Sequence, residues 1–79
     1  MTSPAVYYLH MEMQIVESSL IHSVGHDPDT SKMRVKFHSG ATYEYDGVSE
    51  SDHAAFVTAS SVGKHFGNHI RGTFKSRKL

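Results

Sequence analysis

The chain has 79 residues, enough for one domain with a small core, since a chain of this size buries only about 60 to 65% of its unfolded surface. It contains no cysteine, which excludes disulfides, thiol catalysis and cysteine-ligated zinc folds and fits a reducing cytoplasm. The formal net charge of +0 hides an asymmetry, because residues 1–63 hold three Lys or Arg against eight Asp or Glu, whereas residues 64–79 hold five against none.

The first ten residues carry the longest apolar run, from Ala5 to Leu9. That run is far too short to span a bilayer and lacks the pattern of a signal peptide, so we expect no membrane partner and a cytoplasmic location. Two alternatives stand for residues 1–10: a leader outside the domain, or an added strand through Val6 to Leu9. We place the domain at residues 11–74, between this N-terminal extension and a basic C-terminal tail at residues 75–79.

A first strand is predicted from Ser19 to Val24, ending at Gly25. The next segment, Asp27-Pro28-Asp29-Thr30, predicts a turn because Asp and Pro both favour turn geometry. We therefore expect the chain to reverse here and to begin a second strand antiparallel to the first.

Apolar and polar side chains alternate from Met33 to Phe37 and again from Ala41 to Tyr45, the period of half-buried strands. A three-residue loop with Gly40 in the left-handed conformation gives both strands a consistent register. On the apolar face, this register makes three pairs: Phe37 with Ala41, Val35 with Tyr43, and Met33 with Tyr45. On the polar face it makes two pairs worth roughly 0.2 to 1 kcal/mol each: Arg34 with Glu44, and Lys32 with Asp46.

The period then changes to that of helices. Ser49 and Asp52 resemble a capping box, which predicts a helix from about Glu50 to Ala59. Its inner stripe would carry His53, Phe56, Val57 and Ser60. Ser60 or Ser61 would cap a second short helix, with Val62, Phe66 and Ile70 on its apolar stripe and Lys64, Asn68 and Arg71 on a separate polar stripe.

Beyond Gly72, we expect the basic end from Thr73 to Leu79 to be only partly ordered. The predicted fold class is α+β, with a small three-stranded antiparallel sheet followed by two short helices.

Several segments also form an ordered series: Val16-Glu17-Ser18-Ser19-Leu20-Ile21, Val24-Gly25-His26-Asp27, Met33-Arg34-Val35-Lys36-Phe37, Gly40 with Tyr43-Glu44-Tyr45, Val48, and Ser61-Val62-Gly63 with Phe66 and Ile70-Arg71-Gly72. Over roughly Met11 to Leu79, this series resembles the KTSC domain, a family named for the C-terminus of some lysyl-tRNA synthetases and also found as short bacterial and phage proteins. The resemblance implies a shared fold and a suggested RNA-binding role, with no assigned activity. The chain departs from the family pattern at His26, at Gly67 and in the ending Gly72-Thr73-Phe74-Lys75.

Tyr43 and Tyr45 allow two interpretations. The predicted register turns both rings toward the core, which is the favoured interpretation. The alternative is an exposed platform on which unpaired bases stack, each stack contributing roughly 1 to 3 kcal/mol.

The histidines do not predict a metal site. His65 and His69 have a spacing that can present two imidazoles to one metal, but zinc needs three or four ligands. His22 and His26 could complete a four-histidine cluster, although scattered surface histidines are the simpler explanation. We therefore expect no metal, no cofactor and no catalytic residues, and we interpret the chain as a non-catalytic binding module.

The functional hypothesis rests on the cations. If Lys64 and Arg71 share a solvent-facing side with the tail, they form a continuous strip with it that can bind RNA or tRNA phosphates. The predicted phosphate contacts are Lys64, Arg71, Lys75, Arg77 and Lys78, and the predicted base contacts are Asn68, Tyr43 or Tyr45. The alternative is a protein-interaction module, binding a host factor or forming a homodimer through exposed sheet edges.

Overall fold

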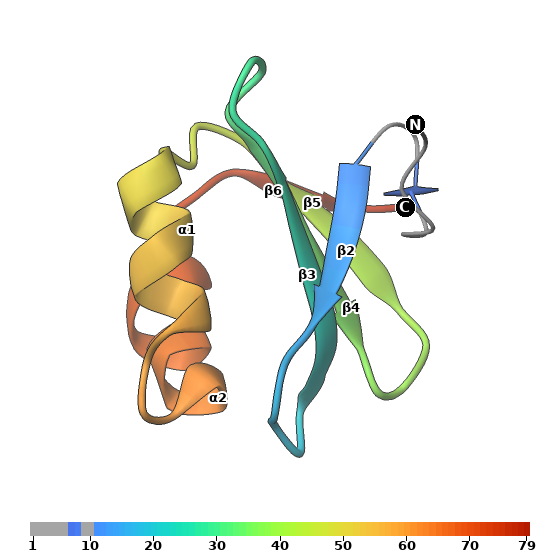
Figure 1. The fold of residues 1–79 in the computed structure, drawn as a ribbon, viewed down its shortest axis with the longest axis vertical. Helices are drawn as coiled ribbons and strands as arrows, with labels where there is room; N and C mark the ends of the chain where they lie inside the picture. The colour runs from blue at the N-terminus through green and yellow to red at the C-terminus, as the bar shows by residue number, and fades with distance from the viewer. Residues whose placement is uncertain (1–6, 9–10) are drawn as a thin grey trace, which may run out of the picture.

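The fold was determined as a computed structural model that describes residues 7–8 and 11–79. The described elements follow one another in this order: β1 (Tyr7–Tyr8), β2 (Met11–Ile15), β3 (Ile21–Asp27), β4 (Lys32–Phe37), β5 (Thr42–Tyr45), α1 (Glu50–Val57), α2 (Val62–His65), η1 (Phe66–Ile70) and β6 (Ser76–Lys78). Each strand pairs antiparallel with the strand before it, so the sheet has the order β1-β2-β3-β4-β5-β6. The helices lie together on one side of this sheet (Figure 1).

The α+β class, the antiparallel sheet and the two helices are confirmed, but the predicted number of three strands is wrong. Strands β2 to β6 form a five-stranded sheet, and the two-residue β1 pairs with the outer side of β2. The prediction omitted β2 although Met11, Met13 and Ile15 alternate with polar residues, which is a strand pattern. It omitted β6 because all three residues of that strand are exposed and show no apolar period.

The C-terminal segment is therefore more ordered than expected. Three residues of the tail form β6, which places Ser76 opposite Tyr45 and Lys78 opposite Tyr43. The backbone pairing continues on both sides of β6: Asp46 N donates to Lys75 O at 2.9 Å and Leu79 N donates to Thr42 O at 2.8 Å. Backbone hydrogen bonds, which any sequence can make, hold this segment in the sheet.

The predicted register of the hairpin is confirmed. Met33 lies opposite Tyr45 and Val35 opposite Tyr43. Phe37 N donates to Ala41 O at 2.9 Å, which closes the predicted three-residue loop. Gly40 has a φ of 100°, a conformation that glycine adopts without a steric penalty.

The first strand of the prediction is observed as β3, but it continues through Gly25 to Asp27 instead of ending at Gly25. Strand β2 pairs with β3 here, with Met13 opposite Gly25, and a Cβ atom added to Gly25 would lie 2.6 Å from Met13 Sδ and 2.8 Å from Glu12 O. Gly25 is therefore a point of close backbone approach within the strand, and not the strand's end.

Helix α1 begins with the predicted capping box. Ser49 Oγ accepts from Asp52 N at 3.0 Å, and Ser49 N donates to the Asp52 carboxylate at 3.4 Å. The helix ends at Val57, two residues before the predicted Ala59. Ser60 is exposed, so its predicted place on the inner stripe is wrong, whereas Phe56 is fully buried.

The second helix is confirmed, with Ser61 as its cap and a widened last turn. Ser61 Oγ accepts from Lys64 N, and α2 then continues into the π-helical turn η1, where Arg71 N donates to Phe66 O at 2.9 Å. The predicted apolar stripe of Val62, Phe66 and Ile70 is buried.

The core lies between the helices and one face of the sheet. Its buried members are Ile21, Val24, Met33, Val35, Tyr45, Val48, Phe56, Val62, Phe66 and Ile70. None of the helices in the described part of the chain is long and apolar enough to cross a membrane. Of the predicted N-terminal strand, Tyr7–Tyr8 forms β1, while Val6 and Leu9 lie outside the described residues.

Candidate functional site

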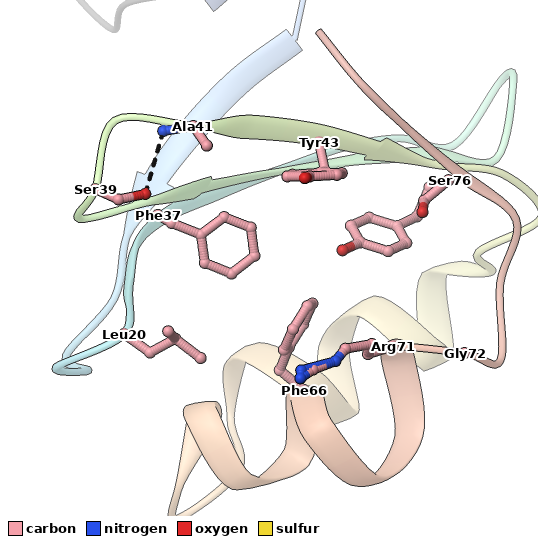
Figure 2. A pocket seen from close by; sticks show the side chains of 10 residues that line it. Leu20, Phe37, Ser39, Ala41, Tyr43, Phe66, Arg71, Gly72 and Ser76 are labelled. Atoms are coloured by element: carbon pink, nitrogen blue, oxygen red, sulfur yellow. Dashed lines mark hydrogen bonds between the residues drawn. The ribbon is translucent and has the colours of Figure 1, made fainter.

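An open groove of about 430 Å³ lies between the helix-facing side of the sheet and η1 (Figure 2). Its volume falls within the range of roughly 300 to 1,000 Å³ that is typical of small-ligand sites. Ten residues line it: Leu20, Phe37, Ser39, Ala41, Tyr43, Tyr45, Phe66, Arg71, Gly72 and Ser76. We call this feature the aromatic groove.

Four rings give the groove its walls. Phe37 projects from β4, and Tyr43 and Tyr45 from β5, all toward the helices because alternate residues of a strand share a face. Phe66 faces them from η1, with its ring centroid 5.3 Å from that of Phe37 and 6.0 Å from that of Tyr45. Both contacts are nearly perpendicular, at 74° and 83°, which is a favoured geometry for aromatic pairs.

The structure decides between the two interpretations of the tyrosines. Tyr45 is 4% exposed and belongs to the core, as the favoured interpretation predicts. Tyr43 is half-buried, packs against the core from its edge and lines the groove. Tyr43 therefore combines a core contact with a surface that a ligand can reach.

Arg71 supplies the only charge among the ten lining residues. It follows η1 directly, and Figure 2 shows its side chain on the helix side of the groove, near Phe66. Burial raises the pKa of the Tyr45 hydroxyl, with the neighbouring Tyr43 adding to the rise and the Arg71 guanidinium opposing it. Tyr45 therefore stays neutral at physiological pH, and the charge of the groove is positive.

Lys78 adds a second cation on the same face. It lies directly opposite Tyr43 in the register of β5 and β6, and directly opposed residues of an antiparallel pair project to the same side. By the same rule, Arg77 lies opposite Glu44 and projects to the side away from the helices. Successive side chains of β6 therefore project to opposite faces of the sheet.

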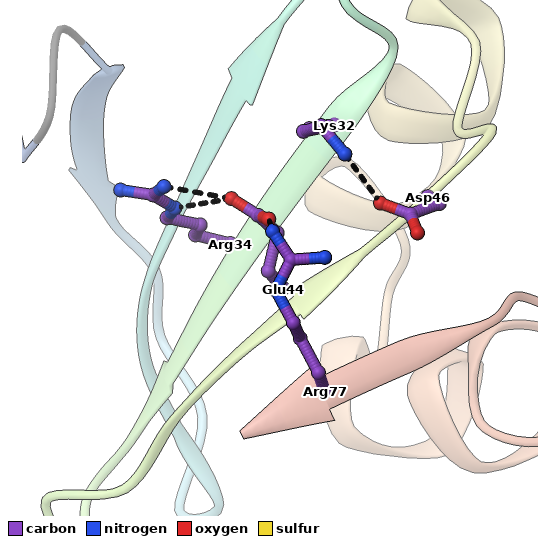
Figure 3. A network of polar contacts seen from close by, with 5 residues as sticks. All are labelled: Lys32, Arg34, Glu44, Asp46 and Arg77. Carbon is purple, nitrogen blue, oxygen red and sulfur yellow. Dashed lines mark hydrogen bonds and ion pairs between the residues drawn. The ribbon is translucent and has the colours of Figure 1, made fainter. Parts of the chain in front are cut away.

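The face away from the helices carries an ion-pair network (Figure 3). Glu44 is 1% exposed, and its Oε2 atom accepts from Arg34 Nε and Nη2, both at 2.7 Å. Its Oε1 atom accepts from Arg77 Nη2. Lys32 Nζ pairs with Asp46 Oδ1 at 2.9 Å, and this hydrogen bond is the main reason that the pKa of Asp46 is lowered.

The predicted continuous cationic strip is therefore divided, because β6 alternates between two faces. Arg71 lines the aromatic groove, Lys78 lies on the same face of the sheet opposite Tyr43, and Arg77 is paired with Glu44 on the opposite face. Lys75 and Asn68 are exposed, on the segment before β6 and on η1 respectively. The remaining predicted contact, Lys64, lines a second hollow of about 410 Å³ that shares Leu20 with the groove.

The sequence did not assign Leu20, Phe37 and Phe66 to a functional site. Phe37 and Phe66 were expected only as apolar core residues, and Leu20 was not singled out. Leu20 is a large apolar residue that is 46% exposed in the folded chain, and such exposure indicates a binding surface. The sequence alone does not show that Leu20 is exposed.

The six histidines that the structure describes form three ring contacts with one another. His65 and His69 have ring centroids 4.6 Å apart, whereas His22 contacts His38 and His26 stacks on His53. Burial lowers the pKa of His65, and the neighbouring His69 lowers it further. Among residues 7–8 and 11–79, no group of three or more potential ligands is placed to hold a metal ion.

The fold and the groove define a class, a small α+β domain with an antiparallel sheet, helices on one face and an open aromatic groove between them. The sequence model of the KTSC domain matches residues 17–74. The chain belongs to the KTSC domain family. Its fold is similar to the crystal structure of a KTSC domain protein from Yersinia pestis, with a TM-score of 0.84, 42% sequence identity, and coverage of 87% of this chain and 97% of that one.

The sequence relatives include both small proteins and much longer ones. An uncharacterised protein of Stutzerimonas stutzeri is 38% identical over 56 residues, which are 71% of this chain and 79% of that protein. A lysine–tRNA ligase of Nostoc punctiforme is 35% identical over 63 residues, which are 80% of this chain but only 11% of the ligase. The KTSC domain therefore occurs both as most of a small protein and as a minor segment of a long enzyme.

Proposed function

We propose that this chain is a nucleic-acid-binding module that holds RNA through the aromatic groove and the cations beside it. The observation that carries the proposal is the placement of Arg71 and Lys78 on the same face as four aromatic rings. Cations bind phosphates with release of counterions, and aromatic rings stack on bases. An unpaired nucleic-acid strand, RNA included, offers both chemistries in one repeating unit.

One relative supports tRNA as the first RNA to test. The matched lysine–tRNA ligase acts, by its name, on tRNA, and the chain corresponds to 11% of its length. Because that segment is so small, the ligase activity itself is not carried over. We propose only that the shared domain contributes contacts to RNA.

A binding role fits the groove better than a catalytic one. Its lining is aromatic, aliphatic and hydroxylic, with Arg71 as the one charged member. A guanidinium neither gives nor takes a proton near neutral pH, and the hydroxyl of Tyr45 is held neutral by burial. We propose a module without a cofactor of its own that works in the cytoplasm, which the lack of cysteine fits.

The predicted contact residues take unequal roles in this proposal. Arg71 and Lys78 bind phosphates at the groove, and Lys64 binds one at the adjoining hollow. Tyr43 is the base contact, with the buried Tyr45 behind it. The exposed residues outside the groove, Asn68 and Lys75, and the ion-paired Arg77 add weaker contacts.

The test is the retention of labelled tRNA on filters at several salt concentrations. We expect measurable binding at low salt, and Arg71→Ala and Lys78→Ala should each weaken it and reduce the salt dependence by about one phosphate contact. The matched control is Lys36→Ala, which removes an equal charge from the other face of the sheet, opposite Thr42. No binding at low salt, or equal losses in all three variants, would contradict the proposal.

A second candidate function is a protein-interaction module, favoured by the outer edge of β2. Among the described residues, β1 covers this edge only at Met11 and Glu12, and Ile15 is 76% exposed. An open strand edge with an exposed apolar residue can add a strand from a homodimer mate or another protein. If the edge binds another protein, a pull-down should recover that protein even after nuclease treatment, and Ile15→Lys should prevent its recovery. If the edge forms a homodimer, Ile15→Lys should leave a monomer by light scattering. In both cases the retention of tRNA should not change.

A further inference from the structure

We propose that the RNA segment bound by the aromatic groove is an unpaired strand of a few nucleotides, which runs from Arg71 at one end of the groove, past Lys78, to Lys64 in the adjoining hollow. This inference rests on the proposed function and specifies the form of RNA that the groove accepts. It depends on three features of the described residues: the aromatic rings, the continuation of the groove into a second hollow, and the positions of the cations.

The rings select for unpaired bases. A base can stack on the half-buried rings of Tyr43 and Phe37, which the buried Phe66 supports from the core, only if its flat face is free. In a duplex, both faces of each base are stacked on neighbouring pairs, and the surface offers phosphates, sugars and base edges. An aromatic groove therefore gains nothing from a duplex, whereas a single strand can place a base in it.

The track continues beyond the groove. Figure 2 shows Leu20 and Ser39 at one end of the groove, and Gly72 and Ser76 at the other. Leu20 also lines the second hollow, which contains Lys64, so the two hollows adjoin at this exposed side chain. Together they provide room for more than one nucleotide along a single path.

Cations are spread along this path. Arg71 lies at the end of the groove that follows η1, Lys78 lies beside Tyr43 on β6, and Lys64 lies in the adjoining hollow at α2. The rings between them suit bases, and the cations suit the phosphates on either side. One anion, Glu17, also lines the Lys64 hollow and would repel a phosphate there.

Hydroxyl groups along the path can meet the polar edges of a base. Ser39 and Ser76 lie at opposite ends of the groove, and the hydroxyl of Tyr45 remains protonated because burial raises its pKa. These groups both donate and accept hydrogen bonds, so they can serve several bases.

The experiment compares two fluorescein-labelled RNAs of equal length and charge by fluorescence anisotropy, an unpaired oligouridine and a self-complementary hairpin. We expect the unpaired RNA to bind at least about fivefold more tightly, the gain from stacking one base. Tyr43→Leu should remove most of this preference. Because Tyr43 contacts the core, the fold of this variant is checked by circular dichroism.

Two exposed residues provide variants that do not depend on the core. Lys64→Ala should weaken binding of the unpaired RNA about twofold to fivefold, and Glu17→Gln should tighten it by a similar factor, since the two changes shift the charge of one hollow in opposite directions. Lys36→Ala, on the other face of the sheet, should leave the affinity for the unpaired RNA unchanged.

The outcomes separate the two proposals. Equal affinity for both RNAs, or a higher affinity for the hairpin, would overturn the proposal that the groove prefers unpaired RNA, but it would still agree with RNA binding. If the affinity for the unpaired RNA is the same in Lys64→Ala and Glu17→Gln as in the original chain, the RNA does not extend into the second hollow, and that part of the proposal is wrong. If neither RNA nor tRNA binds, the proposed function fails as well, and the groove would fit a protein segment instead.

Discussion

Arg77, in the last strand of the sheet, donates a hydrogen bond to the buried carboxylate of Glu44 in the neighbouring strand. The second oxygen of Glu44 is occupied by Arg34, so one carboxylate with 1% exposure holds two guanidinium groups. This contact links β6 to β5 through side chains on the face of the sheet away from the helices. It also takes one of the five C-terminal cations away from a ligand on the groove side.

The first prediction concerns Glu44. Glu44→Ala should lower the free energy of unfolding by about 3 to 5 kcal/mol, because it leaves the buried Arg34 without its carboxylate. Arg77→Ala should lower it by no more than about 1 kcal/mol, since the Arg77 side chain is 56% exposed. Urea unfolding of both variants measures the difference, and equal losses would show that the carboxylate is not the centre of the network.

The second prediction concerns the close pairing of β2 with β3 at Gly25. Gly25→Ala should cost about 1 to 3 kcal/mol of unfolding free energy, because the new methyl group would press on Met13 and on the backbone oxygen of Glu12. The backbone of β2 must move to make room. Thermal unfolding of the variant tests this, and a melting temperature equal to that of the original chain would mean that β2 is not held tightly against Gly25.

The third prediction is a matched pair of glycine substitutions. A Cβ atom added to Gly40 or to Gly67 meets no atom within 4 Å, so space does not distinguish them. Gly40 has a φ of 100°, and Gly40→Ala should cost about 1 to 2 kcal/mol through backbone strain. Gly67 is an exposed residue of η1, and Gly67→Ala should instead stabilise the fold by about 0.5 to 1 kcal/mol. Urea unfolding should show opposite signs.

The fourth prediction concerns acid. The ring of His53 stacks on His26 at 4.9 Å, and its Nε2 atom is buried without a hydrogen-bond partner. Burial lowers the pKa of His53 below its ordinary value of 6.5, and His26 lowers it further. The unfolded chain therefore binds a proton more readily than the folded chain does, so stability should fall as the pH drops through about 6.5.

The His53 effect is checked by urea unfolding between pH 7.5 and pH 5.5. His53→Phe keeps an aromatic ring against His26 but removes the titrating group, so the loss of stability over this interval should shrink. The charged form of His65 is disfavoured in the same way, which means that part of the pH dependence should persist in the variant. An unchanged pH dependence in His53→Phe would contradict the assignment.

Features set by neighbouring residues could be predicted from the sequence. The register of the hairpin follows from the alternation on β4 and β5 together with Gly40, because a shift by one residue would expose the apolar face. The capping box of Ser49 and Asp52 needs only four residues to form. In both cases, the information lies within a short segment.

Features set by distant segments could not be predicted in this way. Strand β6 is held by backbone bonds to β5 and by the contact of Arg77 with Glu44, neither of which leaves an apolar pattern in the sequence. The assignment of Lys78 and Arg77 to opposite faces depends on that pairing. The groove forms between η1 and the sheet, so its position depends on how η1 packs against the sheet. From the sequence, Phe66 could therefore be assigned to the core but not to the wall of a groove.

The central claim is that the helix-facing side of the sheet is the RNA-binding surface. The most direct measurement follows the amide resonances of the labelled protein by nuclear magnetic resonance while a short unpaired RNA is added. We predict that the largest shifts occur at Leu20, Tyr43, Arg71 and Lys78. Shifts concentrated on the opposite face, around Lys36, or no shifts at all, would contradict the claim.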